Sequence, residues 1–402
     1  MPLMNGIGQS EQHRLNRAIV IELLRRKKIC SRADLSKASG LKRPTITNII
    51  NDFIGCGLVV EDGILSSDRG RRSIGLRVNG YQYRVIGVLV TRKYYQIGMM
   101  GLSGEMYEDK VWPIDEMDDA LTIIENIKRN IKLMIDTDGD ARVLSIGIAL
   151  PGPYKREKGE MVFVTNLVGW EFIPVHSKLQ EGFDIPVIIE NDANAGAYAQ
   201  YWCYNKEDAS RDLVYIVAGQ GIGCGIISNG EILRGATGSA GEIGHTTINC
   251  SGGKCECGNY GCLETYCSLI ALEKNVEERV QKGHETSLSE GFTLNELGKA
   301  IQTGDPVARE EFIKACEYFA VGIVNMINQI NPEKVIIGDQ LIDLDSYTMI
   351  EIVRAKVKET VRPLIWESLK IELNELENNP ILMGAGAVAA QRVYENPLYY
   401  MT

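Results

Sequence analysis

Hydrophobic residues recur at helical spacing through the first part of the chain. Between positions 12 and 28 apolar residues follow one another every three or four places, which predicts an amphipathic helix. Ser31 is placed to cap a short second helix over 32–38, and Pro44 stands near the start of a third. A helix, a short helix, a glycine turn and another helix form the pattern of a helix-turn-helix.

Two segments with strand character follow these helices. Residues 59–65 and 73–78 predict a two-stranded wing, which completes a winged helix-turn-helix over residues 1–80. This region holds 14 Lys+Arg and 7 Asp+Glu, a net charge of +7, whereas the rest of the chain holds 29 and 46, a net charge of −17. A basic head on an acidic body indicates that the head meets a polyanion, and we expect double-stranded operator DNA.

The third helix and the tip of the wing carry the side chains expected to meet DNA. Lysine, arginine, threonine and asparagine serve phosphate contacts and base edges, and arginines at a wing tip suit a narrow minor groove. The alternative is a small helical bundle with a solvated basic face, but the order of the elements together with the charge favours DNA binding. The candidates are Lys42, Arg43, Thr45, Thr47, Asn48, Arg69, Arg71 and Arg72.

The pattern changes after position 80 to strands that alternate with helices. Such alternation predicts an α/β architecture, and two strand-rich stretches, over 85–100 and 213–233, suggest two related lobes with a ligand cleft between them. The expected hairpin covers 84–90 and 96–100, the helix 120–135, and the buried strands 143–150, 186–189 and 213–218. The expected divisions are a head over 1–80, a first lobe over 81–192 completed by a C-terminal helix over 384–402, and a second lobe over 193–383.

Composition limits the remaining classes. The chain has 402 residues, 45% hydrophobic and 24% charged, which is typical of a folded protein of two or three domains. No apolar run has the length of a membrane span, and the first residues lack the apolar core of a signal peptide, so we expect a cytoplasmic protein. Ten cysteines in such a protein indicate thiols or a metal site rather than disulfides.

The most specific motif is the stretch GEIGHTTINCSGGKCECGNYGCLE at 241–264. One imidazole and three thiolates suit tetrahedral Zn²⁺, and four protein ligands leave no open position, so the metal is expected to be structural. Three cysteines within eight positions of a polar, glycine-rich loop fit a core poorly. Cys250 and Cys267 lie nearby as substitute ligands. The predicted ligands are His245, Cys255, Cys257 and Cys262.

Two polar or glycine-rich turns follow predicted strands. Residues 190–194 (Glu-Asn-Asp-Ala-Asn) open a helix, where they suit a polyhydroxyl ligand, a general base at Asp192 or an ordinary Asx helix cap. Residues 219–225 hold glycines that let backbone amides approach a phosphate or a sugar. Neither turn alone is specific for a ligand site, because an ordinary helix cap or hairpin turn has the same sequence pattern.

Together these residues resemble the ROK family, which groups bacterial sugar kinases with sugar-responsive repressors. The resemblance covers nearly the whole chain, and the head resembles the winged helix of the repressor branch. It implies that the body is an actin-like (ribonuclease H-like) two-lobed α/β domain with a zinc loop. The matching pieces are residues 151–153, 166–170, 190–194, 241–245 and 262–264.

The resemblance also implies a set of residues that hold sugar hydroxyls. Carboxylates and amides accept and donate in pairs, as adjacent hydroxyls require. His245 would carry two roles, with one ring nitrogen on zinc and the other toward the sugar. The implied residues are Asn191, Asp192, Glu242, His245 and Glu264, with Asn166 and Gly221 as weaker candidates.

The departures from the family pattern concern the phosphates. Active kinases of the family carry an aspartate and then Gly-Gly-Thr in the first hairpin, where this chain has Leu89 and then Thr-Arg-Lys at 91–93. The later glycine cluster is reduced to Gly-Asp-Gln at 338–340, and Gln220 stands where many kinases have threonine. Phosphoryl transfer depends on positioning and charge neutralisation, so we expect no enzyme, with Asp192 as a vestige of the kinase base.

The sequence therefore predicts a sugar-responsive transcriptional repressor. The head would bind operator DNA as part of a homodimer or tetramer, because one helix in one half-site rarely gives enough affinity. A monosaccharide or sugar phosphate in the cleft would close the lobes and change the spacing of the heads. The alternatives are an ATP-dependent sugar kinase with a DNA-binding head, or a repressor controlled by a protein partner.

Overall fold

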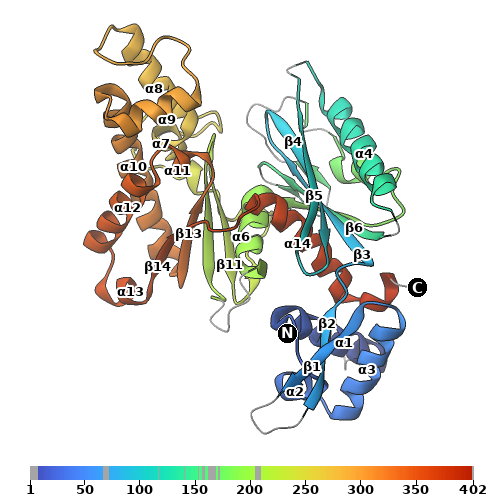
Figure 1. Cartoon of the computed structure of the whole chain (residues 1–402). Helices are drawn as coiled ribbons and strands as arrows, with labels where there is room; N and C mark the ends of the chain where they lie inside the picture. Colours follow the sequence, from blue (N-terminus) through green and yellow to red (C-terminus); the bar gives the residue numbers. More distant parts are fainter. Residues whose placement is uncertain are drawn as a thin grey trace.

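The computed structural model places a small head beside a two-lobed body (Figure 1). Among the residues it describes, no helix is both long and apolar enough to cross a membrane. The predicted DNA contacts Arg69 and Arg71 and the predicted sugar contact Asn166 lie outside the described residues. The structure describes residues 8–66, 72–115, 117–139, 141–152, 154–155, 159–161, 169–170, 173–203 and 210–400.

The head consists of three helices and an antiparallel hairpin, in the predicted order. The second helix begins where the sequence predicts, because the Ser31 hydroxyl accepts a hydrogen bond from the Asp34 N–H while the Asp34 carboxylate accepts one from the Ser31 N–H. The hairpin pairs Val59 with Val78 and Ser66 with Arg72. The elements are α1 (Gln9–Lys27), α2 (Arg32–Ser39), α3 (Arg43–Gly55), β1 (Val59–Ser66) and β2 (Arg72–Val78).

The first lobe is built on a five-stranded sheet of order β5-β4-β3-β6-β9. Its first three strands form an antiparallel meander, and β6 and β9 extend it in parallel. Every residue of β3 is buried, as its unbroken apolar run requires in a sheet covered on both faces. The elements are β3 (Tyr83–Val90), β4 (Tyr94–Gly101), β5 (Met106–Pro113), α4 (Ala120–Thr137), β6 (Arg142–Leu150), β7 (Tyr154–Lys155), β8 (Glu160–Met161), α5 (Val175–Gln180) and β9 (Val187–Asn191).

The second lobe repeats this arrangement with a sheet of order β12-β11-β10-β13-β14. Again three antiparallel strands are followed by two parallel ones, so the two sheets share one topology. The strands are β10 (Leu213–Ala218), β11 (Ile222–Ser228), β12 (Glu231–Ile232), β13 (Lys334–Gly338) and β14 (Lys370–Leu373). The helices are α7 (Glu264–Cys267), α8 (Leu269–Gln281), α9 (Leu294–Thr303), α10 (Pro306–Ile330), α11 (Gln340–Leu344), α12 (Ser346–Thr360) and α13 (Pro363–Ser368), with a 3₁₀ turn, η1, at Ile243–His245.

Two helices pass between the sheets and hold the lobes together. They are α6 (Asp192–Cys203) and α14 (Pro380–Glu395), which is followed by the 3₁₀ turn η2 (Pro397–Tyr400). They cross closely at Gly384, where a Cβ atom would stand 1.8 Å from the carbonyl oxygen of Ala195. Figure 1 shows α14 running through the middle of the body toward the head.

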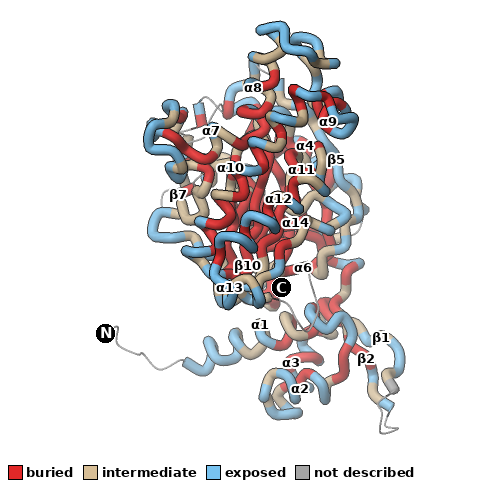
Figure 2. The backbone as a smooth tube through the Cα atoms, turned by 90° about the vertical axis from the view of Figure 1, so that its left-hand side faces the viewer, coloured by how far each residue is buried: buried red, intermediate tan, exposed pale blue. Residues whose placement is uncertain are grey.

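The buried apolar residues form three clusters. One covers the outer face of the second sheet under α8, α10 and α12, and another covers the outer face of the first sheet under α4 and α5. The third lies around α6 and α14 and continues without a break into the core of the head. Figure 2 shows the buried segments of the body and, below them, the smaller buried part of the head.

Candidate functional site

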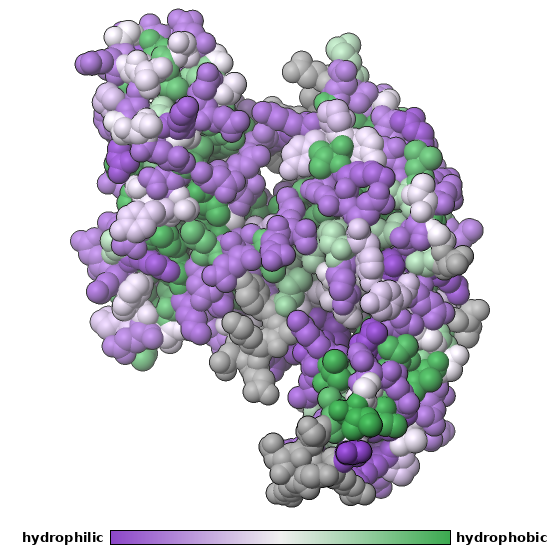
Figure 3. All heavy atoms as spheres, viewed as in Figure 1, coloured by the Kyte–Doolittle hydropathy of each residue, from purple (hydrophilic) through white to green (hydrophobic). Residues whose placement is uncertain are grey.

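A cavity of about 530 Å³ lies between the lobes. Polar residues border the hollow between the lobes in Figure 3. Its lining comes from strand ends and turns of both sheets, where open α/β folds commonly bind ligands. Six of the seven predicted sugar-binding residues line it, and Asn166, the seventh, is not described. The six are Asn191, Asp192, Gly221, Glu242, His245 and Glu264.

Asn191 ends β9 and caps α6. Its side-chain oxygen accepts a hydrogen bond from the Asn194 N–H at 3.1 Å, and its amide donates to the carbonyl of Gly152 at 3.1 Å. This is the Asx cap that the sequence allowed as an ordinary explanation. The cap fixes the first turn of α6 and therefore sets where the neighbouring Asp192 enters the cavity.

Four carboxyl groups that line the cavity have raised pKa values, those of Asp192, Glu242, Glu273 and Asp339. Burial, reinforced by the nearby charge of Asp339, raises the pKa of Asp192 to about 6. Burial, together with the charges of Asp192 and Glu264, raises the pKa of Glu242 to about 7. Like charges in a poorly solvated space disfavour ionisation. The site is thus rich in hydrogen-bond acceptors that gain from polar partners.

Glu264, at the start of α7, reaches the turn between β10 and β11. Its Oε2 accepts a hydrogen bond from the Ile222 N–H at 2.9 Å. A Cβ atom at Gly221 would stand 2.6 Å from the same oxygen, so glycine is needed for this close approach. The carboxylate thus ties the glycine turn to the segment that holds the thiols.

The four predicted metal ligands come together beside the cavity. The ligand atoms of His245, Cys255, Cys257 and Cys262 all lie within 4.8 Å of one another. The Sγ atoms of Cys257 and Cys262 are 3.8 Å apart, and Cys255 Sγ is 3.7 Å from His245 Nδ1. A tetrahedron with metal–sulfur bonds of about 2.3 Å has edges of about 3.8 Å. The donor set and its spacing fit a four-coordinate metal.

The suggested substitute ligands are not part of this group. Cys250 is exposed, and its Sγ lies 4.0 Å from the Ser251 hydroxyl. Cys267 is buried in the second lobe and its thiol donates to the Leu263 carbonyl. Burial and the neighbouring thiols raise the pKa of Cys262 to about 12, so the metal-free thiol is protonated at neutral pH. A bound cation would displace such protons.

The turn between β3 and β4 faces the other half of the cavity. Thr91 closes it with its side chain, which donates to the Tyr94 carbonyl at 2.7 Å and accepts from the Tyr94 N–H at 3.0 Å. Leu89, Arg92 and Lys93 also line the cavity. The positive charge of Arg92 acts to lower the pKa of Asp192 across the cleft. Two cations and an apolar side chain thus stand where the resemblance places a phosphate turn.

Sequence reasoning missed an ion pair behind the cavity. Arg234, in the loop after β12, donates two hydrogen bonds to Oε2 of Glu190, at 2.7 and 3.0 Å. The Glu190 side chain is only 5% exposed, and it also accepts from the Asn194 amide at 3.2 Å. The pair joins β9 of the first sheet to the loop that leads to Glu242. The two residues are 44 positions apart, so no local motif marks them.

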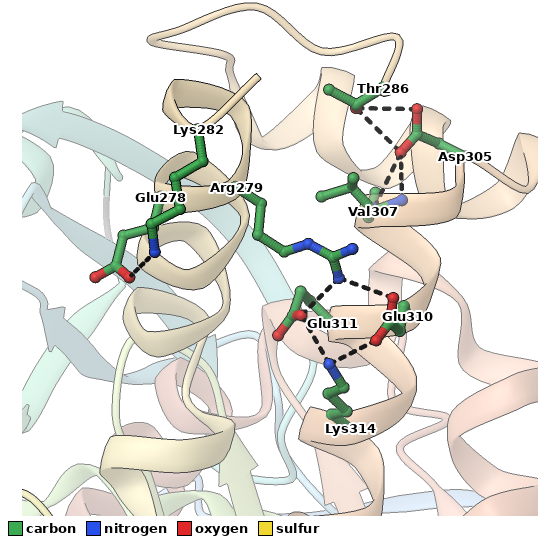
Figure 4. A network of polar contacts seen from close by, with 10 residues as sticks. Glu278, Arg279, Lys282, Thr286, Asp305, Val307, Glu310, Glu311 and Lys314 are labelled. Carbon is green, nitrogen blue, oxygen red and sulfur yellow. Dashed lines mark hydrogen bonds and ion pairs between the residues drawn. The ribbon is translucent and has the colours of Figure 1, made fainter. Parts of the chain in front are cut away.

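Sequence reasoning also missed one wall of the cavity, which the second lobe provides. Glu273 on α8 and residues 292–294 before α9 line it. Figure 4 shows how this region is attached to α10: Arg279 pairs with Glu310 and Glu311, and Lys314 pairs with the same two carboxylates. Asp305 caps α10 and accepts hydrogen bonds from Thr286 and Ser287. These contacts hold the wall in place.

Most of the described DNA-binding candidates lie in the first half of α3, with Lys42 at its N-cap and Arg72 at the start of β2. Ile46, Ile49, Ile50 and Phe53 are buried and face the core of the head. The described candidates are exposed, except that Thr45 is half-buried. On the wing, the exposed Ile64 of β1 pairs with the exposed Ile74 of β2. The exposed candidates are Lys42, Arg43, Thr47, Asn48 and Arg72.

Comparisons with known proteins show which family has this sequence and fold. The sequence model of the ROK family matches residues 85–392. The xylose repressor of Caldicellulosiruptor bescii is 32% identical over 394 residues, covering 96% of this chain and 98% of its own. A glucokinase of Halalkalibacterium halodurans is 28% identical, covering 76% of this chain and 95% of its own.

Among the matching solved structures is one that covers nearly the whole chain. It is a ROK family transcriptional regulator described as a homolog of the E. coli MLC protein, with a TM-score of 0.83 and 28% identity, covering 97% of this chain and 98% of its own. The repressor and this regulator thus extend over the head as well as the body, whereas the glucokinase covers a share that fits the body alone. On this evidence, and on the match to residues 85–392, the chain belongs to the ROK family.

Proposed function

We propose that this protein is a sugar-responsive transcriptional repressor. The observation that carries the proposal is the similarity to a xylose repressor over nearly the whole chain, head included. It is supported by a cleft lined with several carboxyl groups. D-Xylose is the first effector to test, with other monosaccharides and sugar phosphates after it. A tenfold preference of the sugar for one state of the protein corresponds to about 1.4 kcal/mol.

The functional divisions follow from this proposal. Residues 1–80 form the winged helix-turn-helix, 81–192 with the C-terminal helix over 384–402 form the first lobe, and 193–383 form the second. The exposed face of α3 enters the major groove, with Arg72 and the rest of the wing at the minor groove or the phosphates. The protein acts as a homodimer or tetramer, so that two heads read two half-sites.

The thiol cluster holds a structural Zn²⁺ with His245, Cys255, Cys257 and Cys262 as ligands. With Nδ1 of His245 turned toward Cys255, the metal fixes the ring beside the cavity that His245 lines. The metal supplies position and not chemistry, because four protein ligands leave no open coordination site. Asp192, Glu242, Glu264 and the Asn191 amide then hold the sugar hydroxyls, with Asn166 and Gly221 beside them.

The test is a gel-shift titration at fixed salt, since phosphate contacts make affinity strongly salt-dependent. The duplex is one that the protein selects from a random pool, and the titrants are D-xylose and a panel of hexoses, amino sugars and sugar phosphates. The proposal expects at least one sugar to change operator affinity. If none of them does so, the assigned response to sugars is wrong.

A second candidate function is an ATP-dependent sugar kinase with a DNA-binding head. It is favoured by Asp192, whose pKa of about 6 also suits a general base. The Thr91 turn with Arg92 and Lys93 argues against it, because it stands in place of the Gly-Gly-Thr turn that the resemblance assigns to the phosphates. A coupled assay with ATP, Mg²⁺ and hexoses or pentoses decides: turnover that Asp192→Asn abolishes would establish the kinase.

A further inference from the structure

Helix α1 of the head is attached to the ends of the two central helices of the body. Arg25 Nη1 donates a hydrogen bond to the carbonyl oxygen of Trp202 at 2.7 Å, and Arg14 Nη1 donates to that of Glu395 at 2.8 Å. Both carbonyls lie in the last turn of their helices, α6 and α14, where no intrahelical partner is available. A cation is also favoured at this negative end of a helix.

The contact with α6 is the more deeply buried of the two. Arg25 is 3% exposed, and its guanidinium stands 4.3 Å from the centre of the Trp202 ring. Glu22 accepts two further hydrogen bonds from Arg25 and one from Arg26, which also donates to the Tyr201 hydroxyl at 2.6 Å. A buried, forked guanidinium holds one geometry, so the end of α6 and the end of α1 move together.

The other end of α6 lies in the ligand cavity. Asp192 and Ala193, its first residues, line the cleft, and its 12 residues span about 18 Å. Residues 193–200 are all buried between the two sheets. One straight, tightly packed helix therefore joins a proposed sugar contact to the attachment point of the head.

A second connection runs beside it. Gln200 on α6 donates a hydrogen bond to the Asn374 side chain at 2.6 Å, at the start of the loop between β14 and α14. The next residues of this loop, 375–378, line a cavity between head and body, whereas Asn379 and Ile381 line the ligand cleft. The loop thus borders both the cleft and the junction with the head.

The junction leaves room for the head to move. The cavity there measures about 620 Å³. The head lines it with Lys28 and Arg77, and the body lines it with Glu105, Glu375 and Glu377. A gap between oppositely charged walls allows the head to turn toward the body without steric overlap.

We propose that α6, anchored to the head by Arg25 and Trp202 and tied to the 374–379 loop by Gln200, transmits sugar binding in the cleft to the position of the DNA-binding head. This inference rests on the proposed function and names its physical route. A sugar that shifts Asp192 as the lobes close shifts α6, and the buried arginine turns α1 with it. The coupling requires two states with different sugar affinity, and the ligand cavity and the junction cavity leave space for the lobes and the head to take a second arrangement.

The experiment uses the full-length protein and compares Arg25→Gln with Arg17→Gln. Arg17 lies on the same helix but pairs with Asp52 inside the head, so the control loses the same charge without touching the body. Operator affinity is measured at fixed salt with and without D-xylose, or the sugar that proves active in the wild type, and sugar affinity is measured by calorimetry. A thermal melt verifies that each variant is folded, and Gln200→Leu serves as a second variant.

Arg25→Gln should keep the sugar affinity of the wild type but lose most of the sugar effect on operator binding, while Arg17→Gln keeps that effect. A folded Arg25→Gln that responds to sugar as fully as the control contradicts the route and leaves the proposed function intact. A wild type that responds to no sugar contradicts the proposed function instead.

Hydrogen exchange then tests the route without any sugar. Arg25→Gln should raise amide exchange along α6 as far as its first turn at the cleft, relative to Arg17→Gln. An increase confined to α1 would overturn the proposal.

Discussion

At the scale of single residues, the crowding of carboxyl groups sets their pKa values in the cleft. Asp192 and Glu242 each hold a raised pKa because burial and neighbouring negative charges disfavour ionisation. Sugar hydroxyls donate to ionised carboxylates more strongly than to neutral acids. Ligand affinity should therefore depend on pH close to neutrality, although sugars themselves do not titrate there.

We predict that sugar affinity rises with pH between 5 and 7. Below the Asp192 pKa of about 6 the sugar competes with a proton, so affinity should fall by up to about tenfold for each pH unit. Calorimetric titration at several pH values measures this slope. Asp192→Asn should bind more weakly and should reduce the slope below pH 6 to the part that Glu242 contributes. An unchanged profile in this variant would mean that Asp192 does not titrate in this range.

The thiol cluster gives a second prediction at this scale. Cys257→Ser should lose the bound zinc. Without the metal the His245 ring is no longer held in place beside the cavity, so sugar affinity should fall by about tenfold or more, as it does when residues that orient a metal ligand are lost. Operator affinity without sugar should stay near the wild-type value. Metal analysis and calorimetry measure the two effects.

Cys250→Ser is the matched control, because Cys250 is an exposed cysteine of the same loop outside the cluster. It should keep both zinc and sugar binding. A wild-type chain purified without chelators that contains no zinc contradicts the assignment of the metal.

The Glu190–Arg234 ion pair gives a third prediction at the scale of single residues, which concerns stability. Arg234→Ala leaves the buried Glu190 carboxylate without its arginine partner and should lower the free energy of unfolding by about 1–3 kcal/mol. This loss is smaller than that for a fully buried ion pair, because Arg234 is partly exposed. Arg392→Ala breaks an exposed pair with Glu395 and should cost less than about 1 kcal/mol. Denaturant unfolding compares them, and equal losses would refute a role for burial.

At the scale of elements, α3 both packs into the core of the head and exposes the predicted DNA contacts. Its isoleucines and Phe53 build the core of the head, while Arg43, Thr47 and Asn48 stay exposed. Helical periodicity made this division predictable, and the Ser31 cap made the start of α2 predictable. The attachment of α1 to α6 and α14 was not predictable, because it depends on carbonyl groups about 180 and 380 positions away, which carry no side-chain signal.

We predict that Arg43→Ala weakens operator binding by about 1–3 kcal/mol if Arg43 reads a base, or less if it meets a phosphate, with sugar affinity unchanged. Lys282→Ala removes the same charge from an exposed position at the C-cap of α8 and should leave both affinities unchanged. Fluorescence anisotropy with a labelled duplex measures the difference. Equal affinity in both variants would place the DNA-binding face elsewhere.

At the scale of the whole molecule, the two lobes repeat one sheet topology and the head continues the core between them. The α/β class, the paired lobes and the clustering of one histidine with three cysteines could be predicted, because strand runs and a 24-residue motif are local in the sequence. The second wall of the cavity and the Glu190–Arg234 pair could not, since they join segments that only the folded chain brings together. The junction cavity depends equally on tertiary packing.

The central claim is that the cleft holds a sugar but no longer holds a triphosphate. Calorimetric titration of the full-length protein with D-xylose and the sugar panel, and separately with ATP and Mg²⁺, tests it directly. We predict saturable binding of one sugar per chain and no heat of binding from the nucleotide. Stoichiometric binding of ATP·Mg²⁺ beside Leu89 and Arg92, with a phosphorylated sugar accumulating, would contradict it.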